Sequence, residues 1–466
     1  MIVRERSPGA KLLFACLIGL ALAIPLLMVF ALVWDRQGQS QTAQASITQG
    51  WGGPQVVSGP VLVIPYKTTQ TNTEEQNGQR VARTVEVERE LFVAPVEHRA
   101  TTQMQPEIRR KSIYASVLYD AAISGTARFA LPADLPRYGI ARESLEMNRA
   151  EVRFGVSDAR GLRGGSKVVV AGTPVPLQPG KGLAASGNAG FFAFVTWDGT
   201  APLDVAYNYG LRGSRSLALV PRGAHTRWQV RSTWPSPSFG GSFLPDTKSV
   251  AGSGFSADYA VTNLALGQAP VLSDDPGPPQ LLGDEYATSP VAIGGGDRGP
   301  SAAMSVDLIE PVNLYAQVNR AVKYGFLFIG FTFLAFLMFD IVGGARVAAA
   351  EYLLTGAGLV LFFVLLLAFA EVIGFTPAYL LASAAIIGLL TAYSAAVLGT
   401  WARARFIGAL LVGLYALLYV LLNLEAWSLL IGSLLLFAAL AGVMFATRRI
   451  DWSAIGKPGT DPAPAA

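Results

Sequence analysis

The side chains that most often carry metal or nucleophilic chemistry are scarce in this chain. It has a single cysteine, Cys16, and two histidines, His98 and His225. The usual zinc sites use four thiolates, two thiolates with two imidazoles, or three imidazoles, and these residues cannot supply any of those sets. One cysteine also cannot form a disulfide within the chain. The sequence therefore predicts no metal site and no cofactor.

Short motifs that signal other chemistries are also missing. The sequence contains no HExxH, no G-x-S-x-G elbow, no phosphate-binding G-x-x-x-x-G-K-[ST] loop and no EF-hand pattern. The segment GLRGGSKV at 161–168 has the wrong glycine spacing for a phosphate loop, and we interpret it as a hairpin turn. His225 follows a Pro-Arg-Gly turn without a neighbouring His or Cys, and we interpret it as a surface or strand-edge residue.

Carboxylates are the remaining candidates for catalysis. A glycosidase needs two of them about 5–10 Å apart. The sequence does not show which of its scattered aspartates converge, and the candidates are Asp120, Asp158, Asp198, Asp204, Asp246 and Asp258. We interpret them as turn residues and solvent-facing residues, and we keep a carbohydrate-active enzyme as an alternative.

The composition is that of a membrane protein. Hydrophobic residues make up 52% of the 466-residue chain and charged residues only 15%, whereas soluble globular domains carry about 25% charged residues. This shortfall excludes an ordinary cytosolic enzyme and an intrinsically disordered chain. The net charge of +4 comes from dispersed basic residues, so we expect no nucleic-acid partner.

The first apolar run covers residues 12–34 and is long enough to cross a bilayer, since a spanning helix needs about 20 residues. It is longer than the core of a cleaved signal peptide. Basic residues precede it and Asp35 follows it, so we expect the N-terminus in the cytoplasm. Pro25 is compatible with a lipid-embedded helix. Residues 35–50 are candidates for an extension of this helix beyond the membrane.

Further apolar runs of spanning length follow residue 320, at 324–342, 352–370, 378–399, 406–423 and 426–446. With a cytoplasmic N-terminus, six spans place the arginines of the short connections in the cytoplasm, namely Arg346, Arg403, Arg405, Arg448 and Arg449. Glu371 and Glu425 fall on the other side. No ionisable residue lies in the middle of a span, which argues against an ion-coupled transporter. A transporter of a neutral solute or lipid stays as an alternative.

These runs divide the chain into parts with different surroundings. We predict a cytoplasmic N-terminus at 1–11, a first transmembrane helix at 12–34 and a periplasmic domain at 35–320. A five-helix transmembrane bundle follows at 321–446, and the cytoplasmic tail at 447–466 is rich in Pro and Ala and is expected to be disordered.

The predicted periplasmic domain has the composition of an all-β fold. It is rich in Gly, Pro, Ser, Thr and β-branched residues, and short strand-like runs alternate with turn residues. In TRWQVRSTW, residues 226–234, side chains alternate as in a half-buried strand. We predict an antiparallel β-sandwich. The exceptions are a short helix or loop at 100–110, a helical turn within 132–140, a polar hairpin tip at 72–79 and a long loop at 268–300.

A set of strings spread over nearly the whole chain carries a family resemblance. The strings are WGGPQVVSGPVLVIPY (51–66), VSDARG (156–161), WPSPSFGGSFLP (234–245), SGFSADY (253–259), RAVKYGFLFIGFTFLAFLMFDIV (320–342), EYLLTGAGLVLFFVLLLAFAE (351–371) and TRRIDW (447–452). In this order they resemble the CreD family. The resemblance implies an inner-membrane cell-envelope integrity protein with a large periplasmic region, linked to the CreBC regulatory system. It further implies altered tolerance of colicins and β-lactams, but no established molecular activity.

Two of these strings supply the candidate ligand or partner surface. In VSDARG, we expect Asp158 to accept backbone N–H bonds in an Asx-turn and Gly161 to adopt a positive φ. Arg160 is expected to pair with Asp158 or with an anionic ligand. In WPSPSFGGSFLP, the large apolar side chains either plug one end of the sandwich or form the rim of a binding site, and they are Trp234, Phe239 and Phe243.

We therefore predict a non-enzymatic envelope-integrity protein that senses or scaffolds an envelope component through its periplasmic β-domain. It lies in the lipid bilayer, and its candidate partners are peptidoglycan, envelope glycans and other envelope proteins. A periplasmic carbohydrate-active enzyme and a transporter of a neutral solute or lipid are the alternatives. The sequence leaves the oligomeric state open.

Overall fold

The structure of the chain is a computed structural model that describes residues 8–76, 79–280, 299–309, 314–341, 347–423 and 428–448. It divides into two units, one formed by Met1–Ser40 with Val312–Ala466 and the other by Gln41–Pro311. The boundary between them falls inside helix α1 (Pro8–Thr48), which is continuous through Pro25. The helical extension expected from residue 35 onward is therefore confirmed as far as Thr48.

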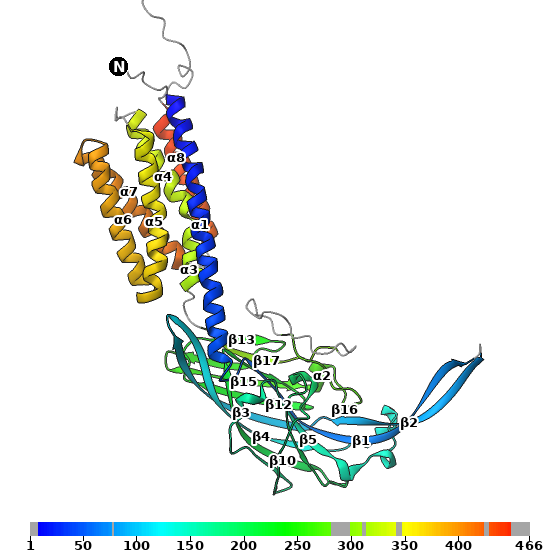
Figure 1. The fold of residues 1–466 in the computed structure, drawn as a ribbon. Coiled ribbons are helices and arrows are strands. Elements are labelled where there is room, and N and C mark those ends of the chain that lie inside the picture. Colours follow the sequence, from blue (N-terminus) through cyan, green and yellow to red (C-terminus); the bar gives the residue numbers. More distant parts are fainter. Residues whose placement is uncertain are drawn as a thin grey trace, which may run out of the picture. The chain divides into compact units, whose positions relative to one another are not determined.

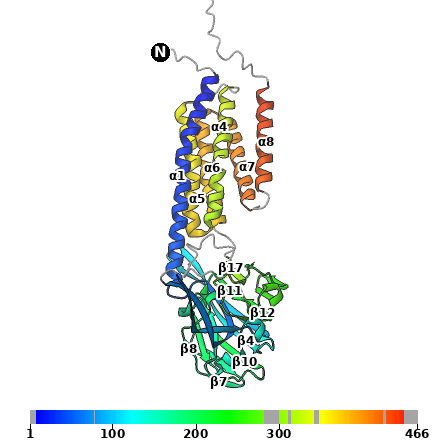
Figure 2. The same ribbon diagram turned by 90° about the vertical axis from the view of Figure 1, so that its right-hand side faces the viewer.

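The first unit consists of apolar helices (Figures 1 and 2). After α1 these are α3 (Leu314–Lys323), α4 (Gly325–Ile341), α5 (Ala349–Ile373), α6 (Phe375–Val397), α7 (Trp401–Asn423) and α8 (Ser428–Thr447). Among the described residues, 5 segments are long and apolar enough to cross a membrane, namely Leu12–Thr48, Leu314–Phe339, Ala349–Ile373, Phe375–Val397 and Trp401–Leu422. These segments overlap the first five of the six predicted spans. The last predicted span, 426–446, falls on α8, a helix of 20 residues in which only some of the side chains are described.

Aromatic side chains fill the centre of the helical unit. Phe362 and Phe363 are buried, and the ring centroids of Phe362 and Tyr415 lie 4.5 Å apart. The hydroxyl group of Tyr379 donates a 2.6 Å hydrogen bond to the carbonyl oxygen of Tyr415, which pairs a polar group inside an apolar core. Gly374 turns the chain between α5 and α6 with a φ of 83°, a conformation that favours glycine.

The second unit contains two β-sheets (Figure 1). The 9-stranded sheet has the order β13-β17-β11-β1-β5-β9-β8, with β2 paired to β1 and β16 paired to β2. Its strands are β1 (Gln55–Gln76), β2 (Gln79–Val93), β5 (Glu151–Val156), β8 (Gln178–Pro179), β9 (Gly190–Phe194), β11 (Ser216–Val220), β13 (Pro237–Gly241), β16 (Val271–Leu272) and β17 (Met304–Leu308).

The 8-stranded sheet has the order β14-β15-β12-β3-β4-β10-β6-β7. Its strands are β3 (Glu97–Lys111), β4 (Tyr114–Phe129), β6 (Lys167–Val170), β7 (Thr173–Val175), β10 (Leu203–Ser214), β12 (His225–Ser232), β14 (Thr247–Ala251) and β15 (Gly254–Thr262).

Most neighbouring strands are antiparallel, as predicted, but each sheet also contains a parallel pair. β1 runs parallel to β11, and β3 runs parallel to β12. A purely antiparallel arrangement is therefore wrong for these pairs. The partners are far apart in sequence, which parallel pairing requires because a tight hairpin joins only antiparallel strands.

One hydrophobic core is shared by both sheets. Leu62 and Ile64 of the 9-stranded sheet belong to the same buried cluster as Met104, Phe129 and Trp228 of the 8-stranded sheet. Side chains of β12 are alternately exposed and buried, which confirms the half-buried strand predicted there. The two sheets and their common core are consistent with the predicted sandwich.

The prediction of a helix or loop at 100–110 is wrong, because these residues form most of β3. The alternation that marks the strand is hidden in the sequence by polar residues on its buried face. His98 and Thr102 are buried along with Ala100 and Met104. Thr102 accepts a 3.0 Å hydrogen bond from Nε1 of Trp228, so the polar side chain is satisfied inside the core.

The smaller expectations for this unit are met where the structure describes them. β1 and β2 extend as a two-stranded ribbon (Figure 1) that ends at the pair of Gln76 with Gln79, within the predicted hairpin tip at 72–79. A 3₁₀ turn at Leu135–Tyr138 is the helical turn predicted within 132–140. Parts of the predicted tip, loop and chain ends lie outside the described residues, namely 77–78, 281–298, 1–7 and 449–466.

Candidate functional site: a collar around the end of helix α1

The last turns of α1 are bound to the hairpin formed by β3 and β4. Nε2 of Gln44 donates a 2.9 Å hydrogen bond to the carbonyl oxygen of Ala115, and Nζ of Lys111 donates a 2.8 Å hydrogen bond to Oγ of Ser46. All of these residues belong to the β-rich unit, which includes the chain from Gln41 onward. The end of α1 is therefore fixed to the sheet that follows it.

The short connection from α1 to β1 carries Trp51. The guanidinium carbons of Arg109 and Arg212 lie 4.0 and 3.9 Å from the centre of its indole ring. A cation placed over an aromatic face is attracted by the ring quadrupole, by about 0.5–2 kcal/mol depending on exposure. The indole Nε1 lies 3.4 Å from the carbonyl oxygen of Tyr119, to which it donates. Trp51 thus joins the connection to β3, β4 and β10.

Asp158 also binds the connection between α1 and β1. Its carboxylate accepts hydrogen bonds from the backbone N–H of Gly53 at 3.2 Å and from the backbone N–H of Arg160 at 3.1 Å. The second of these bonds begins the 3₁₀ turn η4 (Ala159–Gly161) and confirms the predicted Asx-turn.

Arg160 pairs with Asp158, which was one of the two partners expected for it. Nε and Nη2 of the guanidinium each donate a 2.9 Å hydrogen bond to the carboxylate, and Nη1 lies 3.4 Å from the carbonyl oxygen of Gln49, to which it donates. The Arg160 guanidinium holds the pKa of the Asp158 carboxyl below its usual value, with help from the backbone N–H of Gly53. Asp158 therefore stays charged and fully bonded at neutral pH.

Gln55, the first residue of β1, lies at the centre of this arrangement and was not predicted. Its side chain is buried, and its amide bonds to the backbone N–H and carbonyl of Asp158 and to the carbonyl oxygen of Arg212. The only signal in the sequence is its place in the string WGGPQVVSGPVLVIPY. We call Trp51, Gln55, Arg109, Asp158, Arg160 and Arg212 the collar.

Gly161 has a different role from the one expected. Its φ does not lie in the left-handed region, so the predicted positive φ is wrong. A Cβ atom at this position would clash with the carbonyl oxygen of Arg212 and crowd Nε2 of Gln55. Glycine is needed here because two backbone segments approach closely around the Gln55 amide.

The other predicted group lies elsewhere in the β-rich unit. Trp234 is 7% exposed and its Nε1 donates a 3.0 Å hydrogen bond to the carbonyl oxygen of Ile309. Phe239 of β13 and Phe243 are half-buried against the shared core, and the centroids of the Phe239 and Phe255 rings lie 5.7 Å apart. These positions place the three aromatic side chains against the core, and their predicted role in binding stays a prediction.

The strand register relates the two groups. Phe239 lies opposite Val306, which lies opposite Leu217, which lies opposite Gln55. Neighbouring strands are about 4.8 Å apart, so this row puts Phe239 roughly 14 Å from Gln55. The structure therefore does not bring the aromatic residues into the collar.

The scattered aspartates have partners of their own. Asp120 pairs with Arg163 at 2.9 Å, Asp204 pairs with Arg128 at 2.7 Å, and Asp258 accepts a 2.7 Å hydrogen bond from Gln229. Across the described ranges, no group of three or more His, Cys, Asp and Glu residues is placed to hold a metal ion. The collar likewise holds its one carboxylate in structural bonds, which suits it to fixing the chain rather than to reacting.

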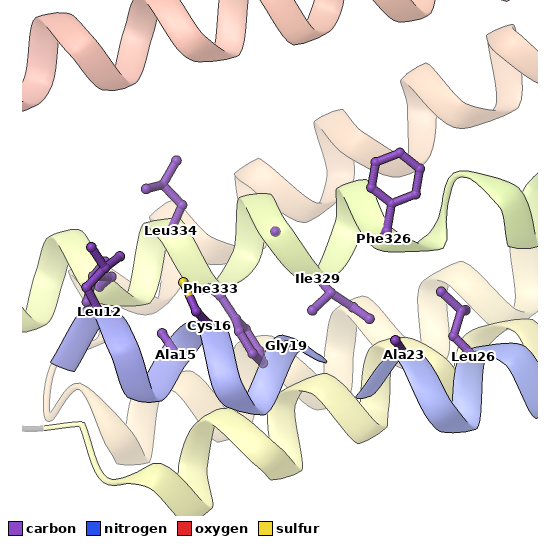
Figure 3. A pocket seen from close by; sticks show the side chains of 12 residues that line it. Leu12, Ala15, Cys16, Gly19, Ala23, Leu26, Phe326, Ile329, Phe333 and Leu334 are labelled. Atoms are coloured by element: carbon purple, nitrogen blue, oxygen red, sulfur yellow. The ribbon is translucent and has the colours of Figure 1, made fainter. Parts of the chain in front are cut away.

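The helical unit offers an apolar groove of about 280 Å³ between α1 and α4 (Figure 3). Small residues of α1, including Ala15, Gly19 and Ala23, face Ile329 and Phe333 of α4. The side chains that line it carry no charge. The groove can therefore receive an apolar occupant but supplies no group for chemistry.

Comparison with known proteins identifies the family. The family described as "Inner membrane protein CreD" matches residues 7–453 of the chain. The Inner membrane protein CreD of Escherichia coli (strain K12) is 31% identical over 449 residues, which cover 94% of this chain and 92% of the relative. The matched range contains the collar, the aromatic group and the helices of both units. The chain belongs to the CreD family of inner membrane proteins.

Proposed function

We propose that this inner membrane protein spans the membrane six times, with both termini in the cytoplasm and residues 35–320 in the periplasm. Support comes from the apolar segments of the described chain, to which α8 adds a helix of 20 residues. The basic residues also support it. If the N-terminus is cytoplasmic, six spans put the connection that carries Arg403 and Arg405 in the cytoplasm, where basic residues are enriched.

We further propose that the β-rich unit senses or scaffolds an envelope component without catalysis, and so maintains envelope integrity. The observation that carries this proposal is the collar. It holds the short connection from α1 to β1 against the β-rich unit at several points along its length. These points are the Gln49 carbonyl, Trp51, the Gly53 N–H and Gln55. A binding event or a pull on the unit is transmitted to α1 only if this connection is firm.

The proposal is tested by loosening the collar in the full chain. Asp158→Asn removes the charge that Arg160 binds while keeping the size of the side chain. The matched control is Arg128→Ala, which removes an exposed ion pair with Asp204 outside the collar. In cells that lack their own family member, we expect Asp158→Asn to reduce tolerance of envelope-directed agents such as β-lactams and the control to restore it fully.

Two measurements make this test decisive. Membrane-inserted protein must be present at equal amounts, and limited proteolysis around residue 50 must show that the connection has loosened. Full tolerance in cells whose collar is demonstrably loosened would contradict the proposal. Equal loss in both variants would show a general effect on the β-rich unit.

A further inference from the structure

The hairpin of β3 and β4 extends past the sheet that contains it. β12 pairs with β3 only as far as Met104, and β10 pairs with β4 only from Leu118 onward. Between these points β3 and β4 pair only with each other in the described sheets, from Gln105 to the tip. Figure 1 shows this hairpin beside the end of α1. We call residues 105–117 the β3–β4 tip.

The tip is basic and partly apolar. Arg109, Arg110 and Lys111 are consecutive and exposed, and Glu107 is the one acidic residue in the segment. Glu107 pairs with Arg109 at 3.2 Å, whereas Arg110 has no ion-pair partner among the described residues. A net positive charge therefore remains.

Two isoleucines are exposed beside these cations. Ile108 is 51% exposed and Ile113 is 43% exposed. Ser112 has a φ of 57°, which makes a sharp turn and puts Ile113 at the very end of the hairpin. Cations around an exposed apolar end are the combination that binds an anionic lipid surface.

The contacts with α1 fix which way the tip points. Gln44 contacts Ala115 near the end of the hairpin, and Trp51, further along the chain, contacts Tyr119 nearer the sheet. Moving along α1 toward its apolar run therefore means moving along the hairpin toward its end. The end of the hairpin therefore points along the last turns of α1 in their N-terminal direction.

Helix and strand rises give the lengths of the segments on either side of these contacts. Gln44 lies about 15 Å along α1 from Trp34, the last apolar residue before Asp35, at 1.5 Å per residue. Ile113 lies about 7 Å beyond Ala115 at roughly 3.3 Å per residue. The hairpin thus extends about 7 Å from Ala115 toward its end, and the headgroup layer extends about 5–8 Å beyond the hydrocarbon on each side.

We propose that the β3–β4 tip binds the headgroup layer of the membrane that α1 crosses, with Arg110 and its basic neighbours on the phosphates of anionic lipid and Ile113 in contact with the upper acyl chains. The proposal rests on the proposed function in one respect, which is that α1 spans the membrane. It adds a second attachment of the β-rich unit, which has only Arg109 in common with the collar. Lys111 also bonds to Ser46, so Arg110 is the cation most available to lipid.

The experiment uses the full chain in lipid nanodiscs made of phosphatidylcholine with or without phosphatidylglycerol. Cys16 is the only cysteine, so Cys16→Ser gives a background in which one new cysteine can carry a fluorophore. The test position is Ile113→Cys. The matched control is Val250→Cys, because Val250 on β14 is a comparably exposed apolar residue, 49% exposed. Lipid that carries a spin label at its headgroup quenches a fluorophore that reaches it.

We expect strong quenching at position 113 in discs that contain phosphatidylglycerol and little quenching at position 250. Arg110→Ala should weaken the lipid-bound state about five-fold, the effect of one cation at an anionic surface, and added salt should weaken it further. Equal quenching at positions 113 and 250 would overturn the proposal. If quenching at position 113 did not change when phosphatidylglycerol was left out, when salt was added or when Arg110 was replaced, the assignment to anionic lipid would be overturned.

A third label separates this proposal from the one it rests on. A fluorophore on the native Cys16 must be quenched by lipid labelled deep in the acyl chain if α1 spans the bilayer. Failure at Cys16 would refute the spanning of α1. Quenching at Cys16 without quenching at position 113 would refute only lipid binding by the tip, and loss of envelope tolerance in Arg110→Ala would then assign the tip to an acidic partner in the envelope.

Discussion

Gln55 and Asp158 hold each other through both ends of the Gln55 amide. Oε1 of Gln55 accepts a 3.1 Å hydrogen bond from the backbone N–H of Asp158, and Nε2 donates a 3.1 Å hydrogen bond to the Asp158 carbonyl oxygen. The same Nε2 lies 2.8 Å from the carbonyl oxygen of Arg212, to which it also donates. Because Gln55 is buried, no water replaces a partner that is lost. One side chain thus joins β1, β10 and the turn that carries Asp158.

Removing this amide should destabilise the β-rich unit. Gln55→Leu keeps the size of the side chain but leaves buried backbone groups unpaired, at about 1–3 kcal/mol for each group. We expect the free energy of unfolding to fall by about 2–4 kcal/mol, measured by denaturant unfolding of the full chain in detergent. Gln103→Leu, at an exposed position of β3, is the control and should change it by less than about 0.5 kcal/mol. Equal effects would show that the Gln55 bonds add nothing.

Two neighbouring glycines should respond differently to a single methyl group. Gly161→Ala introduces a Cβ atom against the carbonyl oxygen of Arg212, whereas Gly164→Ala meets no atom within 4 Å. We expect Gly161→Ala to lower the free energy of unfolding by about 1–3 kcal/mol, the range for overpacking, and to make the chain near residue 50 more sensitive to protease. Gly164→Ala should leave both unchanged. A neutral Gly161→Ala would contradict the close approach described for the collar.

Buried His98 should make stability depend on pH. Burial lowers its pKa to about 4, while Nε2 forms a 2.8 Å hydrogen bond with the Tyr207 hydroxyl. In the unfolded chain the pKa is about 6.5. Above that pH neither state binds the proton and the full stability is present. As pH falls from about 6.5 to 4, only the unfolded chain binds it, so the free energy of unfolding falls by about 1.4 kcal/mol per pH unit, roughly 3 kcal/mol in all.

The measurement is denaturant unfolding of the full chain at several pH values. His98→Gln removes the titrating group and should flatten the dependence between pH 6.5 and 4. His225→Gln is the control, because His225 is exposed on β12 and should leave the dependence in place. The acid-side loss caused by Asp158, Asp198 and Asp204, whose pKa values are lowered by their hydrogen bonds, sets in below about pH 4. If the free energy of unfolding of His98→Gln still fell with the same slope between pH 6.5 and 4, the pH dependence would belong to another group.

Variants of Trp234 and Phe239 test whether these aromatic side chains have a structural role or a binding role. Trp234→Ala removes a buried indole and its bond to Ile309, and should cost about 3–5 kcal/mol. Phe239→Ala removes a half-buried ring and should cost less, about 1–2 kcal/mol. Thermal unfolding gives the stabilities and tolerance of envelope-directed agents gives the function. Intact tolerance in both variants, folded and expressed, would rule out a binding rim at these residues, whereas loss in a stable Phe239→Ala protein would support one.

Much of the architecture follows from the sequence, because long apolar runs and strand-like alternation have a direct physical cause. The runs that predicted the first spans coincide with apolar helices, and the segment around Trp228 is the half-buried strand that its pattern indicated. The sequence does not reveal β3 because His98 and Thr102 occupy buried positions and bond to Tyr207 and Trp228, which are distant in sequence. The parallel pairs were missed for a similar reason, since no local pattern records which strand lies beside β1.

The candidate site was predictable only in part. Asp158 and Arg160 are close in sequence, so their turn and their ion pair are local and were expected. Gln55 and Trp51 act on residues far along the chain, such as Arg212, and nothing in their neighbourhood marks them. The expected positive φ at Gly161 was wrong because the constraint comes from the Arg212 backbone on another strand and not from the turn itself.

The most direct test of the account asks whether the β-rich unit binds an envelope component. Thermal unfolding of the full chain in nanodiscs is measured with and without soluble peptidoglycan fragments and envelope glycans. A component that binds only the folded state adds about 2.7 kcal/mol at a hundred-fold excess over Kd. We predict a rise in the unfolding midpoint of the wild-type protein with one of these components. A cooperative transition that none of them moves, together with no envelope protein crosslinked to the unit in intact cells, would contradict the account.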